Sequence, residues 1–365
     1  MRGLVLEGGG AKGAYEAGAI KALQKKKIYF DGVSGTSIGA INAAFYAERN
    51  LTGLYKLWES TDSSELFGID GEFLNNISHL KFKKSEIQKN KESIKSVIKN
   101  FGIDTKNIRM LLNKYIKEDR IRKSKIDFVI VTFSINDLKP VVVPLTSIIN
   151  YVDLLKKEDI KNGKVQEYIM ASAYLPGFKF EKIIDNKYYI DGGVYDRCPV
   201  NELIDSGYDE IYVIKAWQNK LKYKKKSNVK IHEIKPRENL GSVLVFTKEV
   251  STYRMNLGYF DTLKYLDNLD GKKYYFKHYS DKYYDNLFDK IWYKRIIKKY
   301  NNNIVPRSNK DFIIKIIEKV CIELNIERFK IYNTPYLLTK LKYKMIEKRD
   351  NYYYDFIKNI KVDFE

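Results

Sequence analysis

Two short apolar segments near the N-terminus each run into a glycine-rich turn and then into a helix-forming stretch. In the first, residues 3–7 precede GGGAKG at residues 8–13. In the second, residues 30–33 precede GTSIG at residues 35–39. Repeated strand–turn–helix units are typical of an open parallel sheet covered by helices. The chain is therefore predicted to have an α/β fold.

Later segments continue this pattern. Four more strands are expected at residues 127–134, 140–143, 188–190 and 210–214. A helical, Lys-rich insertion is expected at about residues 51–123, and the pattern becomes helical and Tyr-rich towards the C-terminus. We predict a catalytic domain at residues 1–260, built on an open, mainly parallel sheet flanked by helices, and a helical, basic C-terminal region at residues 261–365.

The charge of the chain predicts attraction to polyanions. Lys and Arg number 66 against 46 Asp and Glu, a formal net charge of +20. Nucleic acid and an anionic membrane surface could both use this charge, but no nucleic-acid-binding module is visible. Residues 272–277 and 291–295 mix aromatic and cationic side chains, as interfacial segments do. We expect peripheral binding to anionic membranes, with helix core as the alternative for these two segments.

Other sequence features bear on the compartment. Cys198 and Cys321 lie far apart without metal-ligand spacing, which fits a reducing compartment or an exported protein that needs no disulfide. No signal-peptide pattern opens the chain, and no apolar run approaches the roughly 18 residues of a spanning helix. The expected location is cytoplasmic or peripheral on a membrane. The densest basic stretch, residues 215–237, is expected to be a solvated loop.

The G-x-G-x-x-G of residues 8–13 is compatible with two classes of protein. A dinucleotide-binding fold uses such glycines to bring the backbone close to a pyrophosphate, and it needs an acidic residue about 20 positions further on. Asp31 stands at that position. A nucleotide-binding oxidoreductase is therefore an alternative that the glycine loop by itself leaves open.

The G-x-S-x-G of residues 35–39 indicates a nucleophile elbow. A serine on a sharp turn between strand and helix holds strained backbone angles, so the flanking Gly35 and Gly39 avoid clashes with neighbouring backbone. The hydroxyl of Ser37 would then project at a helix N-terminus, where the dipole favours developing negative charge. A helix-capping serine between tolerant glycines is the structural alternative.

The two glycine motifs are complementary if their strands are neighbours in a parallel sheet. Both loops then emerge at the same edge of the sheet. The tetrahedral intermediate of acyl transfer needs backbone N–H donors close to its oxyanion. The amides of Gly9, Gly10 and Ala11 could supply them to a substrate at Ser37. Lys12 could add positive charge near the site or be solvated, and we expect it to be solvated.

A serine nucleophile needs a base, and histidine is scarce in this chain. The only histidines are His79, His232 and His278. None of them lies in a segment that reads as a strand-end loop. Asp191 is the better candidate, because it ends an apparent strand and precedes Gly192 and Gly193, which allow a sharp turn. An ordinary turn is the structural alternative.

Together these motifs resemble the patatin-like phospholipases, which carry a glycine-rich oxyanion loop, a G-x-S-x-G and an Asp-Gly-Gly or Asp-Gly-Ala in this order. ASAYLPGF at residues 171–178 and DGGVYDRCPVN at residues 191–201 are also similar to segments of that family. The resemblance covers roughly residues 1–214. It departs from the family pattern at residues 178–181, FKFE, and in the C-terminal third, which leaves the preference for acyl chain and headgroup open.

The resemblance implies a lipid acyl hydrolase of the phospholipase A type that needs no metal and no cofactor. Ser37 would attack the acyl carbonyl, and Asp191 would take its proton and later activate water. The motif positions that carry the resemblance are Gly8, Lys12, Gly13, Gly35, Gly39, Gly192 and Gly193. An acyltransferase would use the same dyad, and a basic binding protein with an inactive serine site is a third possibility.

Overall fold

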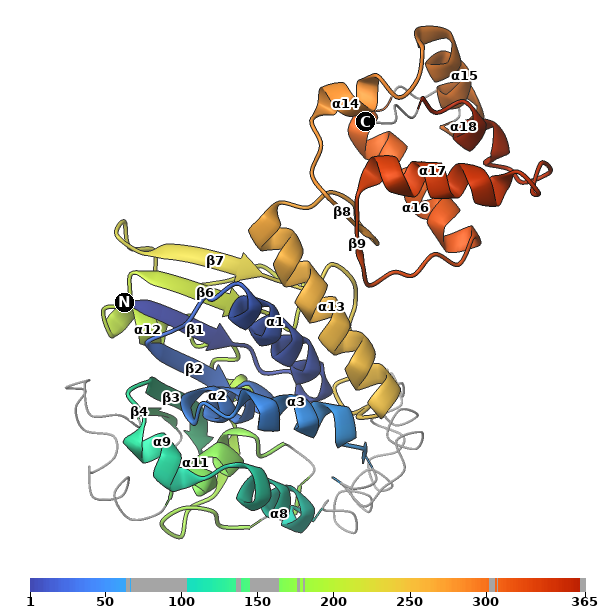
Figure 1. Cartoon of the computed structure of the whole chain (residues 1–365). Helices are drawn as coiled ribbons and strands as arrows, with labels where there is room; N and C mark the ends of the chain where they lie inside the picture. Colours follow the sequence, from blue (N-terminus) through green and yellow to red (C-terminus); the bar gives the residue numbers. More distant parts are fainter. Residues whose placement is uncertain are drawn as a thin grey trace, which may run out of the picture. The chain divides into compact units, whose positions relative to one another are not determined.

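The chain divides into two compact units, Met1–Asp261 and Thr262–Glu365 (Figure 1). The computed structural model describes residues 1–63, 66, 104–135, 139–144, 164–175, 178–179, 181–301, 306 and 308–361. Residues 67–103 of the predicted insertion, which include His79, lie outside the described residues, as do Pro176 and Gly177. Within the described parts of residues 51–123, the backbone forms the helices α3 (Leu51–Ser60), α8 (Lys106–Tyr115) and α9 (Glu118–Lys123).

The first unit is built on one mainly parallel sheet, which confirms the predicted fold class. Its strands are β1 (Arg2–Leu6), β2 (Gly32–Thr36), β3 (Asp127–Ser134), β4 (Lys139–Pro144), β5 (Tyr189–Asp191), β6 (Glu210–Ile214) and β7 (Lys230–Ile234). They follow the order β4-β3-β2-β1-β6-β7, and β5 also pairs with β3. The strands from β7 to β3 are parallel, whereas β4 and β5 are antiparallel to β3.

Helices cover both faces of this sheet. Figure 1 shows α1 (Gly13–Lys25), α2 (Ile38–Ala47), α3 and α13 (Lys248–Asp267) on one face and α12 (Val200–Asp205) on the other. On the α12 side, Leu203 and Ile204 join Val5 and Val213 of the central strands in one buried apolar cluster. Because both faces are covered, β1 and β6 are apolar runs rather than alternating sequences.

The prediction that residues 215–237 form a solvated loop is wrong at the start of the stretch, where Lys215 is 1% exposed, and in its C-terminal part. Lys230–Ile234 forms β7, which pairs in parallel with β6. Lys230 is exposed, and only Ile234 of this strand is fully buried. An edge strand tolerates such a polar sequence because one of its backbone edges and much of its surface face water. The charge pattern therefore concealed the strand.

Two glycines allow α1 and α13 to touch backbone to backbone. A Cβ at Gly18 would lie 1.9 Å from the carbonyl oxygen of Met255, and a Cβ at Gly258 would lie 1.9 Å from that of Tyr15. No side chain fits at either position without moving one helix. The close approach holds α13 against the helix that follows the glycine loop.

Gly258→Ala is therefore expected to destabilise the first unit by about 1–3 kcal/mol, as overpacking of a tight interior contact does. This loss outweighs the gain of up to about 1 kcal/mol that Ala usually brings to a helix. Thermal unfolding of the two variants Gly258→Ala and Thr252→Ala provides the measurement, since Thr252 is exposed on the same helix. If the midpoint temperature of unfolding of Gly258→Ala equals or exceeds that of the wild type, the predicted effect of this close helix contact is wrong.

The second unit is mainly helical. Its elements are β8 (Tyr275–Phe276), α14 (Asp281–Asp285), α15 (Lys290–Tyr300), α16 (Asn309–Glu323), β9 (Ile331–Tyr332), α17 (Thr334–Met345) and α18 (Tyr354–Lys358). The core is centred on α16 and α17, where Ile313, Val320, Leu337 and Leu341 are fully buried. Side chains at the N-caps of α15, α16 and α17 accept backbone N–H groups, which fixes where these helices begin.

Tyr274 and Phe276 of segment 272–277 belong to this core. Tyr274, Tyr275 and Phe276 are at most 4% exposed, so the prediction of an interfacial role for this segment is wrong. In segment 291–295, Ile291 is exposed, whereas Trp292 packs against the core of the unit. Both segments mix aromatic and cationic residues. Only the packing of their side chains shows whether such a segment is buried or exposed.

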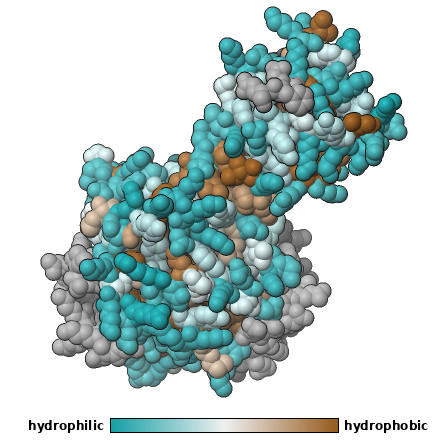
Figure 2. Space-filling model, viewed as in Figure 1, coloured by the Kyte–Doolittle hydropathy of each residue, from teal (hydrophilic) through white to brown (hydrophobic). Residues whose placement is uncertain are grey.

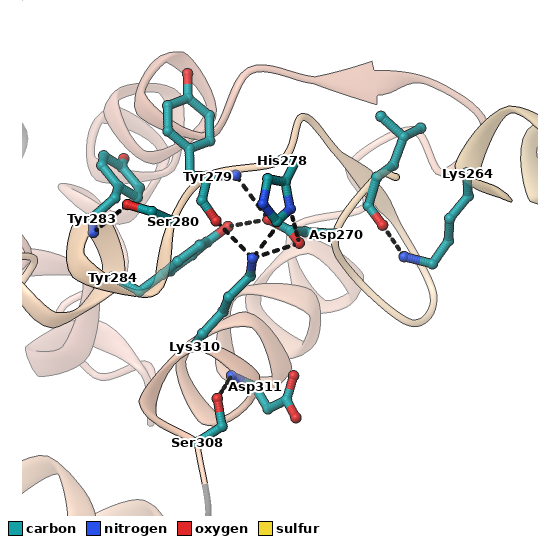
Figure 3. Close-up of polar contacts among 11 residues, drawn as sticks. Lys264, Asp270, His278, Tyr279, Ser280, Tyr283, Tyr284, Ser308, Lys310 and Asp311 are labelled. Carbon is teal, nitrogen blue, oxygen red and sulfur yellow. Dashed lines mark hydrogen bonds and ion pairs between the residues drawn. The ribbon is translucent and has the colours of Figure 1, made fainter. Parts of the chain in front are cut away.

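A buried carboxylate, that of Asp270 between α13 and β8, binds Lys310 of α16, as Figure 3 shows. Asp270 Oδ1 lies 2.8 Å from Lys310 Nζ and 3.1 Å from His278 Nδ1. Its Oδ2 accepts the backbone N–H of Tyr279 at 3.0 Å and the hydroxyl of Tyr284 at 3.4 Å. Both oxygens are therefore satisfied, as a buried charge requires. We assign this cluster a structural role.

The surface in the view of Figure 2 is mainly hydrophilic, with scattered apolar residues. Among the residues that the structure describes, no helix combines the length and the apolar character needed to cross a bilayer.

Candidate active site

Ser37 lies on a strained turn between β2 and α2. Its backbone angles, φ of 59° and ψ of −128°, are rarely adopted by residues other than glycine. The flanking glycines have no room for a side chain. A Cβ at Gly35 would lie 2.3 Å from the carbonyl oxygen of Gly39, and a Cβ at Gly39 would lie 2.3 Å from that of Leu6. This geometry is that of a nucleophile elbow.

A second, buried serine holds the backbone of this turn by a hydrogen bond. Ser172, at the end of α11 (Val165–Ser172), accepts the backbone N–H of Ser37 at 2.9 Å. Its hydroxyl donates in turn to the carbonyl oxygen of Val131 at 2.6 Å. Ser172 lies in the ASAYLPGF segment that carried the resemblance, but its sequence context gave no indication of this contact. Sequence reasoning missed it.

Sheet pairing brings Asp191 to this turn. Asp191 ends β5 and is paired with Thr132 of β3, and the neighbouring Val131 is paired with Thr36 of β2. A Cβ at Gly192 would lie 2.0 Å from the carbonyl oxygen of Val131, so only glycine fits at this position. The carboxylate is thus placed beside the elbow by strands far apart in the sequence.

Asp191 is almost fully buried, with 6% of its surface exposed. Its Oδ1 accepts the N–H of Gly193 at 2.7 Å. Within the described part of the chain, Oδ2 has no hydrogen-bond partner of standard geometry. The hydroxyl of Ser37 is nevertheless near enough to interact with the carboxylate. Such loosely aligned contacts are common in sites without substrate.

The pKa of Asp191 is raised, and the main cause is burial. The Ser37 hydroxyl, the Gly193 N–H and the positive charge of Arg197 all act in the opposite direction and limit the rise in pKa. A carboxylate with a raised pKa is a stronger base than an exposed one. The environment of Asp191 therefore suits proton transfer.

The glycine loop lies against the elbow. A Cβ at Gly8 would lie 3.2 Å from the Cβ of Ser37. Gly10 has a φ of 54°, and a Cβ there would lie 2.2 Å from the carbonyl oxygen of Val243. The loop therefore needs glycine both for its backbone angles and for its close packing.

Two of the three predicted oxyanion donors have free amides. Among the described residues, no hydrogen bond engages the N–H groups of Gly9 and Gly10. The N–H of Ala11, in contrast, donates to the carbonyl oxygen of Val243 at 2.7 Å. Ala11 is thus a correction to the sequence prediction, because a tertiary contact from a distant loop occupies its amide.

The prediction that Lys12 is solvated is also wrong. Lys12 is 3% exposed, and its Nζ lies 3.3 Å from the ring centroid of Trp217. Burial lowers the pKa of Lys12 to about 8, and the charge of Arg254 adds to this effect. A cation–π contact is a usual way to hold a partly desolvated ammonium group.

An apolar cavity of about 70 Å³ opens beside Ser37. Its lining residues are Gly10, Ser37, Ile38, Ile41, Leu57, Trp58, Thr61, Leu66, Ile108, Leu111, Leu112, Ala173, Leu175, Phe178 and Phe246. Trp58 and Phe246 stack in this wall with ring centroids 5.9 Å apart. Ser37 and Gly10 therefore border a space suited to a hydrocarbon chain.

Asp31 does not lie where a dinucleotide-binding fold would need it. Its carboxylate accepts the N–H of Arg2 at 2.8 Å. Arg2 begins β1, whereas the glycine loop follows the end of that strand. The strand separates the acidic residue from the loop, so the two cannot hold one ribose and pyrophosphate in the way that such folds do.

Neither described histidine is bonded to Ser37 or Asp191. His232 lies on β7, stacks on Tyr212 and contacts Glu210 at 3.0 Å. His278 belongs to the Asp270 cluster of the second unit. Both side chains therefore have structural partners of their own.

A model of the patatin-like phospholipase family matches residues 4–204 of the chain. A lysophospholipase nte1 of Aspergillus terreus is 26% identical over 213 residues, which cover 58% of this chain and 12% of that protein. A neuropathy target esterase sws of Drosophila persimilis is 53% identical over 51 residues, or 14% of this chain and 4% of that one. The chain thus spans a small part of these relatives.

Among solved structures, VipD from Legionella pneumophila is similar with a TM-score of 0.44 and 18% identity, over 95% of this chain and 80% of that one.

Proposed function

The chain belongs to the patatin-like phospholipase family, and from this premise we propose that it is a lipid acyl hydrolase of the phospholipase A type. One observation carries the proposal. Ser37 and Gly10 line an apolar cavity, the Asp191 carboxylate is close enough to interact with the Ser37 hydroxyl, and the amides of Gly9 and Gly10 are free of hydrogen bonds to described residues. This arrangement supports Ser37 as nucleophile, Asp191 as base, the two amides as oxyanion donors and the cavity as acyl site.

The proposed reaction proceeds through an acyl-enzyme. The Ser37 hydroxyl attacks the ester carbonyl while Asp191 accepts its proton, and the N–H groups of Gly9 and Gly10 stabilise the oxyanion. Asp191 then returns the proton to the departing alcohol. In the second half, Asp191 takes a proton from the water that attacks the acyl-serine, and it returns this proton to the oxygen of Ser37 as the fatty acid departs. The N-terminus of α2 adds a favourable dipole at the developing negative charge.

The direct test is release of free fatty acid from vesicles that contain both anionic and zwitterionic phospholipids. Hydrolysis by the wild type supports the proposal. If acyl groups instead appear on an added alcohol, the same acyl-enzyme serves an acyltransferase, and the hydrolase assignment falls. Absence of both products would contradict the proposal.

We further propose that the second unit supports weak binding to anionic bilayers. Tyr336 and Tyr343 are 71% and 69% exposed on α17. Their spacing of seven residues places them on one helix face, with the exposed Lys340 between them. Aromatic and cationic side chains together are typical of membrane-surface helices. The net charge of +20 favours the same partner.

The double variant Tyr336→Ser/Lys340→Gln is accordingly expected to bind anionic vesicles about fivefold more weakly, from the loss of the lysine alone, with a further loss from the tyrosine. Co-sedimentation with phosphatidylglycerol vesicles measures the change. The matched control is Tyr29→Ser/Lys225→Gln, which alters exposed residues of the first unit. Equal binding of the wild type to phosphatidylglycerol and phosphatidylcholine vesicles would refute the proposal.

A further inference from the structure

A second cavity, of about 320 Å³, adjoins the glycine loop and is more polar than the first. It is bordered by Lys12, Arg197, residues 216–219, Pro236 and residues 238–240. Gly9 packs against its wall, because a Cβ there would lie 2.9 Å from that of Ala216 and 3.4 Å from Trp217 Nε1. The glycine loop thus contributes to the surroundings of both cavities.

Two cations approach Trp217 in this cavity. Lys12 Nζ is 3.3 Å from the ring centroid, and the guanidinium carbon of Arg197 is 5.0 Å from it. The indole is fixed in place, because its Nε1 donates to the carbonyl oxygen of Gly8 at 3.0 Å. The tryptophan therefore acts as a rigid platform for both side chains.

Neither cation has a carboxylate partner within ion-pair distance among the residues that the structure describes. Glu7 influences Lys12 electrostatically, but its carboxylate accepts the N–H groups of Ala216 and Trp217. An almost buried ammonium group without a counter-ion is costly unless an anion joins it. Glu238 also borders the cavity, where it accepts the hydroxyl of Tyr253, so two cations face a single carboxylate there. An anion in the cavity would add to the cation–π contact of Lys12 and offset the cost of burying its charge.

Arg197 connects this cavity to the reaction centre. Its Cγ lies 3.4 Å from the Cβ position of Gly8 and 3.6 Å from that of Gly193. Its charge also acts on Asp191. An anion held by Arg197 would consequently adjoin the nucleophile elbow while the acyl chain occupies the apolar cavity.

We propose that Lys12 and Arg197 bind the phosphate of the substrate headgroup. This binding would make the enzyme selective for phosphate-bearing glycerolipids over neutral ones, and the proposal rests on the proposed hydrolase function. A phosphate group offers several acceptor oxygens to the two cations, and Arg is well suited to it. A headgroup with a positive charge at this position would meet repulsion from both side chains.

The test uses two substrates that carry the same acyl ester and differ only in the phosphate, 1-oleoyl-lysophosphatidic acid and 1-oleoylglycerol. Both are presented at low density in neutral detergent micelles at matched ionic strength. We expect the kcat/KM ratio of the phosphate substrate over the neutral one to fall about 10- to 100-fold in Arg197→Gln, the range for a lost hydrogen bond to a charged group. Arg197→Lys should restore part of the ratio.

Lys225→Gln is the matched control, since Lys225 is an exposed cation of the first unit that does not line the cavity. Its substrate ratio is expected to equal that of the wild type. A ratio that Arg197→Gln leaves unchanged would overturn the headgroup site while leaving the hydrolase function intact.

Calorimetric titration with glycerol 3-phosphate and with inorganic phosphate distinguishes the other cases. Binding of glycerol 3-phosphate that depends on Arg197, in a protein that hydrolyses neither lipid, would support the anion site and remove the proposed function. Binding of inorganic phosphate that depends on Arg197, combined with an unchanged substrate ratio, would identify free phosphate as the ligand and overturn the headgroup assignment.

Discussion

Replacing Ser37 by alanine is expected to reduce fatty-acid release by about 10⁴-fold or more, because no other group supplies the nucleophile in the proposed reaction. The fold should survive this change. The Ser37 side chain makes no capping hydrogen bond at the start of α2, so alanine removes the reactive hydroxyl without removing a helix cap. Loss of activity can then be read as loss of chemistry.

The measurement is the initial rate of fatty-acid release from phospholipid vesicles, together with the thermal midpoint of each variant. Ser60→Ala serves as the control, since Ser60 is an exposed serine at the end of α3. A fluorophosphonate probe should label the wild type at Ser37 and leave the Ser37→Ala variant unlabelled. Full activity in Ser37→Ala would show that the nucleophile assignment is wrong.

Asp191→Asn is expected to reduce the rate by about 10³- to 10⁴-fold, since an amide cannot accept the serine proton. Asparagine keeps the shape of the side chain and can still accept the N–H of Gly193. Burial raises the pKa of Asp191, so the wild-type rate should rise with pH through a midpoint above the usual aspartate value. The residual activity of the variant should lack this acid limb.

The contribution of Asp191 to the stability of the fold should fall with pH, whereas the catalytic rate should rise. Because the folded-state pKa of Asp191 lies above the unfolded one, this group contributes stability at low pH that is lost as the pH rises through the folded pKa. At neutral pH the buried carboxylate is a cost, and Asp191→Asn should unfold at the same temperature as the wild type or higher. That difference should shrink at acid pH.

Asp196→Asn is the matched control for Asp191→Asn. Asp196 lies five residues further along the same segment, and burial raises its pKa as well. Its carboxylate accepts the N–H of Cys198 at 2.9 Å and does not contact Ser37. This variant should keep most of the wild-type activity. Comparable losses in the two variants would indicate a general electrostatic or structural effect instead of a base at Asp191.

Much of the local architecture around the nucleophile could be predicted from the sequence. The strand–turn–helix units at residues 8–13 and 35–39 depend on backbone angles and on contacts with adjacent segments. Glycine at Gly10, Gly35 and Gly39 is the only residue type that fits such positions. This requirement is visible in the residue types themselves, which is why the α/β fold and the turn at Ser37 followed from the sequence.

Other features were decided by contacts between distant segments. The antiparallel pairing of β5 with β3 carries Asp191 to the elbow, and Val243 occupies the amide of Ala11. The burial of Lys12 under Trp217 also follows from the way β6 and its loop return to the glycine loop. From its sequence neighbours alone, a lysine is predicted to be solvated. Only a partner from elsewhere in the chain can bury it.

The sequence by itself therefore determined the mainly parallel sheet and the glycine-bounded turn that presents Ser37. The tertiary structure decided how Asp191 is brought beside that serine, which amides stay free and where Lys12 and Arg197 place their charge. The physical reason is range: backbone angles and steric limits act over a few residues, whereas strand pairing, burial and charge placement depend on groups that only the folded chain brings together.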